Sequence, residues 1–160
     1  MKVKDVFKPR LKSCTPVTSL DAVGRIMWES DSGAVPVVDA EGKVTGLLTD
    51  RDLAMSMAAK NRGSSQILVR EVTSGELFTC VPEDEIAAAI QKMRTNRVRR
   101  LPVIDAQGKL LGMLSLKDLA LAANGSSGIS CEDVALTLQT LCQPKTETAP
   151  QWPWVNAAAR

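Results

Sequence analysis

The sequence predicts an α+β fold, in which two copies of one strand–helix–strand–strand–helix unit pack together as a single pseudo-twofold module. An internal repeat, the apolar pattern within each copy and a glycine-containing turn in each copy lead to this prediction. The segment PVVDAEGK at residues 36–43 recurs as PVIDAQGK at residues 102–109, an offset of 66 residues. The same offset relates Cys14 to Cys80 and Asp52 to Asp118 without a gap, so one fold is used twice.

Apolar spacing and turn residues define the elements of the first copy. Apolar side chains at helical spacing predict a helix that Ser19 and Asp21 open and Gly33 ends. A short apolar run, a glycine-containing turn and a second apolar run then predict a buried hairpin. The expected elements are that helix, strands at residues 35–38 and 44–48 around a turn at 39–42, and a second helix from residue 49 to about 59.

The second copy repeats this order, with a helix at residues 84–95, strands at 101–104 and 110–114 around a turn at 105–108, and a helix from residue 115. One copy alone would have too little core to be stable, because a domain of about 60 residues is already marginal. We therefore divide the chain into repeat 1 at residues 1–60, a linker at 61–75 whose mobile part is 62–65, repeat 2 at 76–124, and a tail at 125–160.

The composition favours a compact domain with an aliphatic core. Hydrophobic residues make up 44% of the 160 residues but aromatic residues only 3%, so Val, Leu, Ile, Met and Ala must build the core. The formal charge is +2, and acidic and basic residues alternate, which argues against a face that binds a nucleic-acid duplex. The one dense basic stretch, residues 97–100, is too short to hold a duplex alone.

The chain has no histidine, which removes the commonest general base and the commonest metal ligand. Its four cysteines include no C-x-x-C pair, which argues against a zinc site or a redox dithiol. Two disulfides could form, but the N-terminus leads into no apolar run of signal length, and no stretch approaches about 20 apolar residues. We therefore expect a soluble cytoplasmic protein with reduced thiols, no membrane segment and no metal.

The repeated residues follow the pattern P-V-[VI]-D-x-x-G-K-x-x-G-x-L-[TS]-x-x-D-L. This pattern resembles the signature of the CBS (cystathionine-β-synthase-type) domain, and two copies in tandem resemble a Bateman module; the resemblance covers residues 3–123. It implies two clefts between the repeats, which in many members bind AMP, ADP, ATP, S-adenosylmethionine or NAD-type ligands. Members commonly dimerise into a flat disc and regulate an attached enzyme, channel or transporter.

The ribose-binding motif of this family is a Ser or Thr followed three residues later by Asp. It matches Thr49 with Asp52 and Ser115 with Asp118. The carboxylate of such an Asp can accept hydrogen bonds from both ribose hydroxyls. The helix N-terminus beside it favours an anion, so the resemblance assigns these four residues to the ligand.

A capping box is an alternative interpretation of both motifs, because the same hydroxyl and carboxylate can satisfy the N–H groups of the helix itself. Arg51 and Lys117 lie in the first turn of these helices, where the helix dipole disfavours a cation. A phosphate nearby would explain them, so both join the candidate ligand-binding residues. The two roles can coexist, with Thr49 capping the helix and Asp52 turned to the ligand.

The two copies differ just before their second strand, where the first reads DSGA at residues 31–34 and the second reads RVRR at 97–100. In the family, a basic residue at this point often reaches phosphate groups. Arg99, and above all Arg100, are therefore candidate phosphate ligands, and the two clefts would be unequal. The alternative is a solvated basic strand edge that protects against edge pairing.

The resemblance places the slot for the adenine base near the first strand of each copy, at Thr15 and Pro16 and at Val81 and Pro82. The cysteine that precedes each pair is expected to be a small buried hydrophobe. No base is available to activate either thiol, so a nucleophilic role has no support.

The second helix of each copy is apolar around much of its circumference, whereas a surface helix normally hides one stripe. Small Ala and adaptable Met suit close packing between subunits, so we expect a homodimer through these helices. Trp28, near the end of the first helix, lies either at this interface, which we favour, or at the rim of the core. The residues concerned are Leu53, Ala54, Met55, Met57 and Ala58 in the first copy and Leu119, Ala120, Leu121, Ala122 and Ala123 in the second.

The repeat pattern stops after the segment NGSSG at residues 124–128. A capping box at residues 130–133 predicts a short helix over residues 130–142, and the segment from residue 144 is expected to be disordered. Trp152 and Trp154 are unusual in such a segment and could dock on a partner or on the module itself. The family pattern does not cover this tail, so the tail inherits no function.

Together these patterns favour a regulatory module that binds an adenosine-containing ligand and requires no cofactor. The module would signal to a separate, unknown effector protein. The alternative is a structural or interaction module that keeps the fold without using its nucleotide clefts. An enzyme is the least favoured interpretation, because the sequence offers only Asp, Lys and Arg at helix starts.

Overall fold

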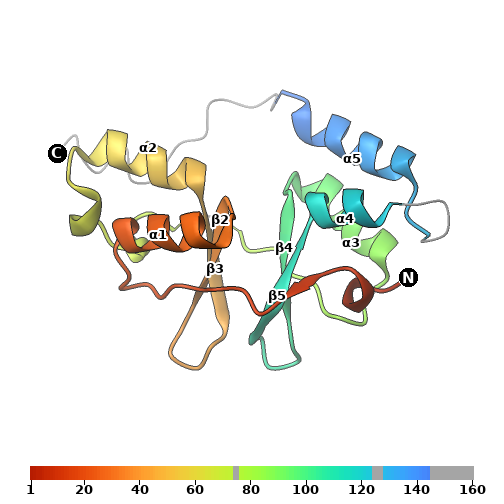
Figure 1. The fold of residues 1–160 in the computed structure, drawn as a ribbon, viewed down its shortest axis with the longest axis horizontal. Coiled ribbons are helices and arrows are strands. Elements are labelled where there is room, and N and C mark those ends of the chain that lie inside the picture. The colour runs from red at the N-terminus through yellow and green to blue at the C-terminus, as the bar shows by residue number, and fades with distance from the viewer. Residues whose placement is uncertain (74–75, 124–127, 145–160) are drawn as a thin grey trace. The chain divides into compact units, whose positions relative to one another are not determined.

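The structure is a computed structural model of the chain, and it describes residues 1–73, 76–123 and 128–144. The chain forms two compact units. The first-repeat unit is built from Lys12–Leu77, and the second-repeat unit from Met1–Leu11 together with Phe78–Lys145. Each unit combines helices with a small antiparallel sheet (Figure 1), which confirms the predicted α+β class.

The first-repeat unit places a hairpin of two strands against two helices. Leu20 and Val23 on the first helix pack with Val35, Val37 and Leu48 of the hairpin, and all of these side chains are buried. Gly42 turns the hairpin with φ of +81°, a conformation that a residue without Cβ adopts without strain. The elements are α1 (Leu20–Ser30), β2 (Ala34–Val38), β3 (Val44–Thr49), α2 (Asp50–Lys60) and the 3₁₀ helices η2 (Ser64–Gln66) and η3 (Val69–Glu71).

The second-repeat unit has the same plan with two additions, an N-terminal strand and a C-terminal helix. Its sheet has the order β1-β5-β4, and both neighbouring pairs are antiparallel. The elements are the 3₁₀ helix η1 (Val3–Asp5), β1 (Lys8–Pro9), α3 (Ile86–Asn96), β4 (Arg100–Ile104), β5 (Leu110–Ser115), α4 (Leu116–Ala122) and α5 (Cys131–Cys142).

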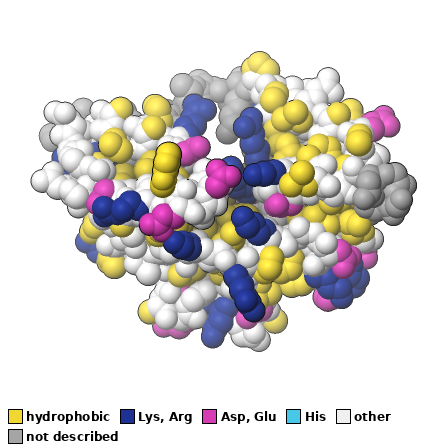
Figure 2. Space-filling view, in the orientation of Figure 1, with side chains coloured by type: hydrophobic (Ala, Val, Ile, Leu, Met, Phe, Trp, Pro, Cys, Tyr) yellow, Lys and Arg dark blue, Asp and Glu magenta, His cyan; other side chains and the backbone are white. Residues whose placement is uncertain are grey.

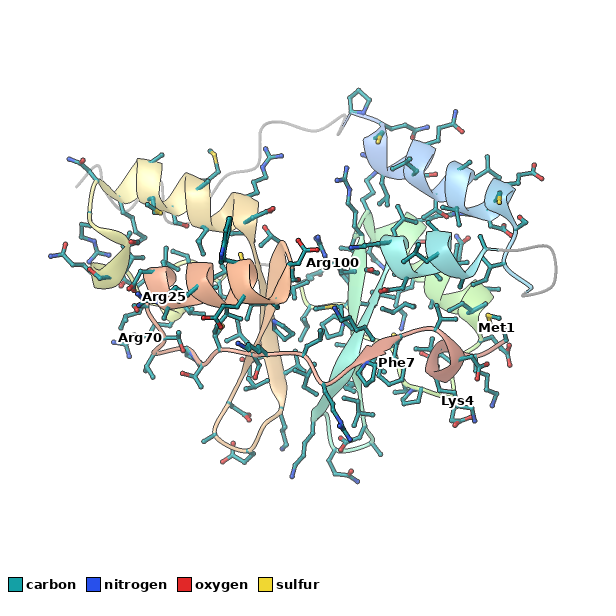
Figure 3. All side chains as sticks on the ribbon, viewed as in Figure 1. Met1, Lys4, Phe7, Arg25, Arg70 and Arg100 are labelled. Carbon is teal, nitrogen blue, oxygen red and sulfur yellow. The ribbon has the colours of Figure 1, made fainter. Side chains whose placement is uncertain are left out.

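The opening segment of each sequence repeat packs in the unit of the other repeat. Val3, at the start of the first repeat, is completely buried in the core of the second-repeat unit. Val69, its counterpart at the 66-residue offset, is completely buried in the core of the first-repeat unit. Figure 3 shows Lys4 and Phe7 on the N-terminal segment, which runs beside β5. The second-repeat unit is therefore assembled from two separate stretches of chain, whereas the first-repeat unit is one continuous stretch that includes the opening segment of the second repeat.

This exchange corrects the prediction that residues 61–75 are a linker with a mobile part. Ile67, Val69 and Val72 are buried core residues, and residues 64–66 form a 3₁₀ helix. The predicted first strand of each copy is reduced to single parallel bridges, Cys14 to Val37 and Cys80 to Val103.

Helix α5 lies where the tail was expected to form a helix. The tail from residue 145 onward, with its expected disorder and with Trp152 and Trp154, lies outside the described residues. Within the described ranges, no helix has both the length and the apolar character needed to cross a membrane.

Candidate functional site

Both predicted ribose motifs lie where a strand passes directly into a helix, and both form complete capping boxes. At the start of α4, the Ser115 N–H donates to Asp118 Oδ2 (2.8 Å), and the Asp118 N–H donates to Ser115 Oγ (3.3 Å). The Ser115 hydroxyl also donates to Asp118 Oδ2. Thr49 and Asp52 repeat this arrangement at the start of α2, at 2.8, 3.3 and 2.6 Å.

Capping leaves one carboxylate oxygen of each aspartate available. All of these bonds end on Oδ2, so Oδ1 of Asp52 and of Asp118 has no hydrogen-bond partner among the described residues. Both aspartates are half-buried. The capping role and an acceptor role toward a ligand are therefore compatible in geometry, because an ionised carboxylate has acceptor sites on both oxygens.

The strand register brings the arginines of the second copy to Ser115. Arg100 is directly opposite Ser115 in the β4–β5 pair, so the two side chains leave the same face of the sheet with Cβ atoms about 5 Å apart. The Leu116 N–H donates to the carbonyl of Arg99 at 3.0 Å. Neither guanidinium group has a hydrogen-bond or ion-pair partner among the described residues. Arg100 is labelled at the start of β4 in Figure 3.

The first-repeat unit has the same backbone at this point without the arginines. Ala34, 3% exposed, is opposite Thr49, and the Asp50 N–H donates to the carbonyl of Gly33 at 3.2 Å. Arg51 is exposed in the first turn of α2, as Lys117 is in α4. The two helix starts thus share their capping geometry and differ in the positive charge beside it.

The N-terminal strand contributes residues that the sequence analysis did not include in the site. Lys8 pairs with Met113, two residues before Ser115, and Pro9 pairs with Gly112. The ring of Phe7 and the carbonyl of Lys8 pack directly on Gly112. The repeat offset gives the only signal for this position, because Thr73, the counterpart of Phe7, lies against Gly46 of β3 in the same way.

The four residues expected to form adenine slots lie directly after the bridges Cys14–Val37 and Cys80–Val103. The segment before Thr15 runs beside Val37, on the edge of β2 away from β3, and the segment before Val81 runs beside Val103. The carbonyl of Pro16 accepts from the Arg70 N–H (2.9 Å).

The second copy uses the same contact, since the carbonyl of Pro82 accepts from the Lys4 N–H (3.0 Å). The observed role of these turns is thus to hold the exchanged segments. Whether Thr15, Pro16, Val81 and Pro82 also touch a ligand stays a prediction.

The cysteines at the bridges are core residues, as predicted. Cys14 and Cys80 are 3% and 2% exposed and unpaired. Burial raises the pKa of Cys14 from 9.0 to about 11 and that of Cys80 to about 12, so neither forms a thiolate near neutral pH. Among the residues that the structure describes, no group of three or more His, Cys, Asp or Glu is arranged to hold a metal ion.

The second helices of the two copies, through which a homodimer is expected, differ in the exposure of their apolar side chains. Met55 and Met57 of α2 are 40% and 42% exposed, but Leu119 of α4 is completely buried. Helix α5 packs on α3 and α4 and covers that face, while Leu121 remains 77% exposed. The C-terminal helix of the chain thus occupies part of the apolar band of α4, and the homodimer through the second helices stays a prediction.

The chain is a small module that contains two copies of one α+β unit. In each copy, an aspartate caps the helix that directly follows a strand. A family model described as CBS domain matches residues 3–59 and 69–125, and the chain belongs to the CBS domain family. The CBS domain-containing protein YhcV of Bacillus subtilis (strain 168) is 34% identical over 135 residues, which cover 83% of this chain and 94% of YhcV.

Solved structures share the fold. CBSX2 in complex with AMP has a TM-score of 0.64 at 26% sequence identity, over 76% of this chain and 94% of that chain. The CBS domain pair of protein MJ0100, in complex with 5′-methylthioadenosine and S-adenosyl-L-methionine, has a TM-score of 0.69 at 20% identity, over the same shares of each chain.

Proposed function

We propose that this chain is a regulatory module that binds an adenosine-containing ligand and signals the bound state to a separate effector protein. The ligand would be AMP, ADP, ATP, S-adenosylmethionine or an NAD-type molecule. The observation that carries the proposal is the arrangement at the start of α4, where Asp118 keeps a free carboxylate oxygen and Arg100 lies opposite Ser115 on the same sheet face. A carboxylate for ribose hydroxyls and a guanidinium for phosphate are the two recognition groups that a nucleotide needs.

The second-repeat unit would provide the stronger site. Its ligand set comprises Ser115, Asp118, Lys117, Arg99 and Arg100, with Lys8 as a further cation close to β5. These basic side chains have no ion-pair partner among the described residues, so a bound phosphate would supply the missing negative charge.

The first-repeat unit offers Thr49, Asp52 and Arg51 and has Ala34 in place of Arg100, so we expect it to bind phosphate less tightly. AMP bound to CBSX2 and S-adenosyl-L-methionine bound to the MJ0100 pair support this ligand class.

Thermal unfolding with AMP, ADP, ATP, NADH and S-adenosylmethionine tests the proposal. A ligand present at 100 times its dissociation constant should add about 2.7 kcal/mol of stability. If none of the five raises the unfolding midpoint, the regulatory nucleotide-binding function is wrong.

Matched variants separate ligand binding from helix capping. Asp118→Asn keeps an oxygen that can accept the Ser115 bonds but removes the negative charge, so it should weaken ligand binding with little loss of stability. Ser115→Ala removes the side-chain cap of α4 and should lower the free energy of unfolding by about 1 kcal/mol. It leaves the carboxylate of Asp118 in place for the ligand. Arg100→Ala should weaken binding of AMP but not of adenosine, which has no phosphate. If all three proteins bind as the native chain does, the site assignment fails.

A structural or interaction module is the second candidate function. The observation that favours it is the completeness of both capping boxes, since helix stability alone explains Thr49, Asp52, Ser115 and Asp118. Under this function no nucleotide changes the unfolding midpoint. Turnover assays with the same nucleotides test the proposal that the chain is not an enzyme.

We retain two further parts of the predicted function as proposals. A homodimer would use the side of α2 that carries Met55 and Ala58, together with the exposed Leu121 of α4. Light scattering of the native chain and of Met55→Glu tests it, and a monomer at micromolar concentration would contradict it. A cytoplasmic location remains the proposed setting, and fractionation of expressing cells would check it.

A further inference from the structure

The first-repeat unit has an open groove between α1 and α2. It encloses about 470 Å³ and is lined mainly by apolar atoms of Gly24, Met27, Trp28, Leu53, Ala54 and Met57. Trp28 is 89% exposed and Met57 is 42% exposed. An exposed large aromatic side chain at the rim of an apolar hollow is the usual composition of a protein-binding surface.

In the second-repeat unit, α5 packs against both α3 and α4, the helices that correspond to α1 and α2. The counterparts of Met27 and Leu53 at the 66-residue offset are Met93 and Leu119, and both are completely buried. Their core cluster includes Ile129 and Val134, from the start of the α5 region. The molecule therefore contains its own example of an amphipathic helix seated between the two helices of a repeat.

Arg94 and Arg97 make polar contacts with α5 and with the residues that directly follow it. Arg94 donates through Nε to the Thr137 hydroxyl (2.8 Å) and through Nη2 to the carbonyl of Asp133 (2.8 Å), and it forms an ion pair with the Asp133 carboxylate (3.6 Å). Arg97 donates to the carbonyl of Pro144 at 3.3 Å. The occupying helix has two acidic residues in its first turn and no basic residue, so a basic groove holds an acidic helix.

The open groove has the opposite polarity at these positions. Trp28 replaces Arg94 and Asp31 replaces Arg97, and Asp50 is a second acidic residue on the lining. Asp31 and Arg97 adopt the same left-handed backbone conformation, with φ of 46° and 51°, so the two units match in backbone at the end of the first helix and differ there in charge. Figure 2 shows acidic side chains beside an exposed hydrophobic side chain over α1.

We propose that the groove between α1 and α2 is a docking site for an amphipathic helix of a partner protein, with an aliphatic stripe like that of α5 but with basic residues in its first turn. A Lys or Arg at the position that Asp133 occupies on α5 would lie over the Trp28 indole and near Asp31, where cation–π attraction and charge both favour it. A second copy of the chain fits less well, because it would bring the same acidic rim against itself. The site is separate from Ser115 and Asp118, so it stands whether or not a nucleotide binds.

Fluorescence anisotropy with three labelled peptides tests this docking site on the full chain without nucleotide. Each peptide has the sequence of residues 129–143 with serine for both cysteines; one keeps Glu132 and Asp133, one has E132Q and D133N, and one has E132K and D133K. The basic peptide should bind most tightly and the acidic one least. The same peptides are then measured on the Trp28→Arg/Asp31→Arg chain, which carries the arginines of the filled groove, and the order should reverse. Differences in peptide helicity cancel, because each peptide is compared between two proteins.

The ratio of the dissociation constants of the acidic and basic peptides should change by about tenfold or more between the two proteins. Lys43→Ala, in the exposed hairpin turn of the same unit, is the control and should leave the ratio unchanged.

An unchanged ratio in the double variant, or no binding of any peptide, overturns the proposal. Light scattering would also overturn it if the native chain is a dimer and the Trp28→Arg chain is a monomer, because the groove would then bind a second copy of the chain. Binding that appears only in a Trp152→Ala/Trp154→Ala chain overturns it in favour of the chain's own C-terminal segment.

Discussion

The carbonyl oxygen of Lys8 lies so close to Gly112 that a Cβ atom on that glycine would approach it to 2.2 Å. This contact fixes the N-terminal strand against β5, since Pro9 pairs with Gly112 in the sheet. Only a residue without a side chain allows the backbone of β1 to come this near. The glycine of the repeated pattern G-x-L is thus explained by strand packing, independently of any ligand.

Gly112→Ala should lower the free energy of unfolding by about 2 to 3 kcal/mol, because the atom it would meet belongs to the backbone and cannot turn away. Gly46→Ala is the matched variant, since its Cβ would meet Cγ2 of Thr73 at 2.5 Å. A side chain can adjust, so this change should cost about 1 kcal/mol. Urea denaturation measures both, and equal losses would contradict the explanation.

The exchange of segments predicts where core variants loosen the molecule. Val3→Ala removes a completely buried side chain from the core of the second-repeat unit, although Val3 starts the first sequence repeat. Amide hydrogen exchange should therefore quicken in α3, β4 and β5. Val69→Ala should quicken exchange in α1, β2 and β3 instead. If each valine affects the unit that contains the rest of its own sequence repeat, the exchange is wrong.

The buried thiols should be unreactive and should make the fold sensitive to alkali. Cys14 and Cys80 have pKa values raised to about 11 and about 12 by burial, whereas Cys131 and Cys142 are exposed. An alkylating reagent at pH 8 should add two labels to the native chain and four to the unfolded chain, as mass spectrometry would count. Four labels on the native chain would contradict the burial of the first pair.

The raised pKa of the two buried thiols should make the folded state less stable at alkaline pH. A thiol whose pKa is higher in the folded state than in the unfolded state keeps its proton on folding, so stability is full below pH 9 and falls as pH rises toward 11 and 12. Replacing both buried cysteines with valine should remove this part of the pH dependence. Comparison of native and variant urea midpoints between pH 8 and 10.5 measures it, with the lysine titrations common to both.

Arg94→Met should release α5 from its groove, because it removes the bonds to Thr137 and Asp133 but keeps an apolar stem. We expect a loss of about 1 to 3 kcal/mol and faster amide exchange across α5. Arg25→Met, which removes an exposed ion pair with Asp21 on α1, is the control and should cost at most about 0.5 kcal/mol. A similar effect from both variants would show that α5 does not depend on Arg94.

The ion pair between Arg94 and Asp133 should be lost in acid. A hydrogen bond from Ser130, with the charge of Arg94 nearby, lowers the pKa of Asp133 below 3.8. The contribution of this pair is therefore present above about pH 4 and is lost as pH falls through the lowered pKa. Exchange across α5 should quicken in acid before exchange in α3 does.

The sequence alone was sufficient for the elements that depend on local pattern. Residues 36–43 and 102–109 repeat a strand and a glycine turn, and apolar spacing after Ser19 and around Met93 predicts helices that the structure contains. The helix over α5 followed from the capping box at Ser130, whose hydroxyl and N–H both bond to Asp133. Local signals of this kind need only neighbouring residues to be interpreted.

The long-range pairings could not be predicted in this way. Nothing near Val3 or Val69 indicates which core receives it, because both segments carry the same short apolar pattern and either core would accept it. The cover of Leu119 by α5 likewise depends on tertiary contacts. The pairing of Arg100 with Ser115 lies within one predicted hairpin, but its register shifts between Val103 and Ile104. The site was therefore predicted by residue type at Asp52, Asp118 and Arg100, while Lys8 was missed because its place depends on the exchange.

Because each unit borrows its first turn from the other half of the chain, the repeats cannot be divided at residue 60 into two autonomous proteins. A fragment with residues 12–60 would lack Val69, and a fragment with residues 76–144 would lack Val3, so each would expose a vacancy in its core. The two sequence repeats therefore depend on each other within one polypeptide, because loss of either opening segment removes a buried residue from the core of the other repeat.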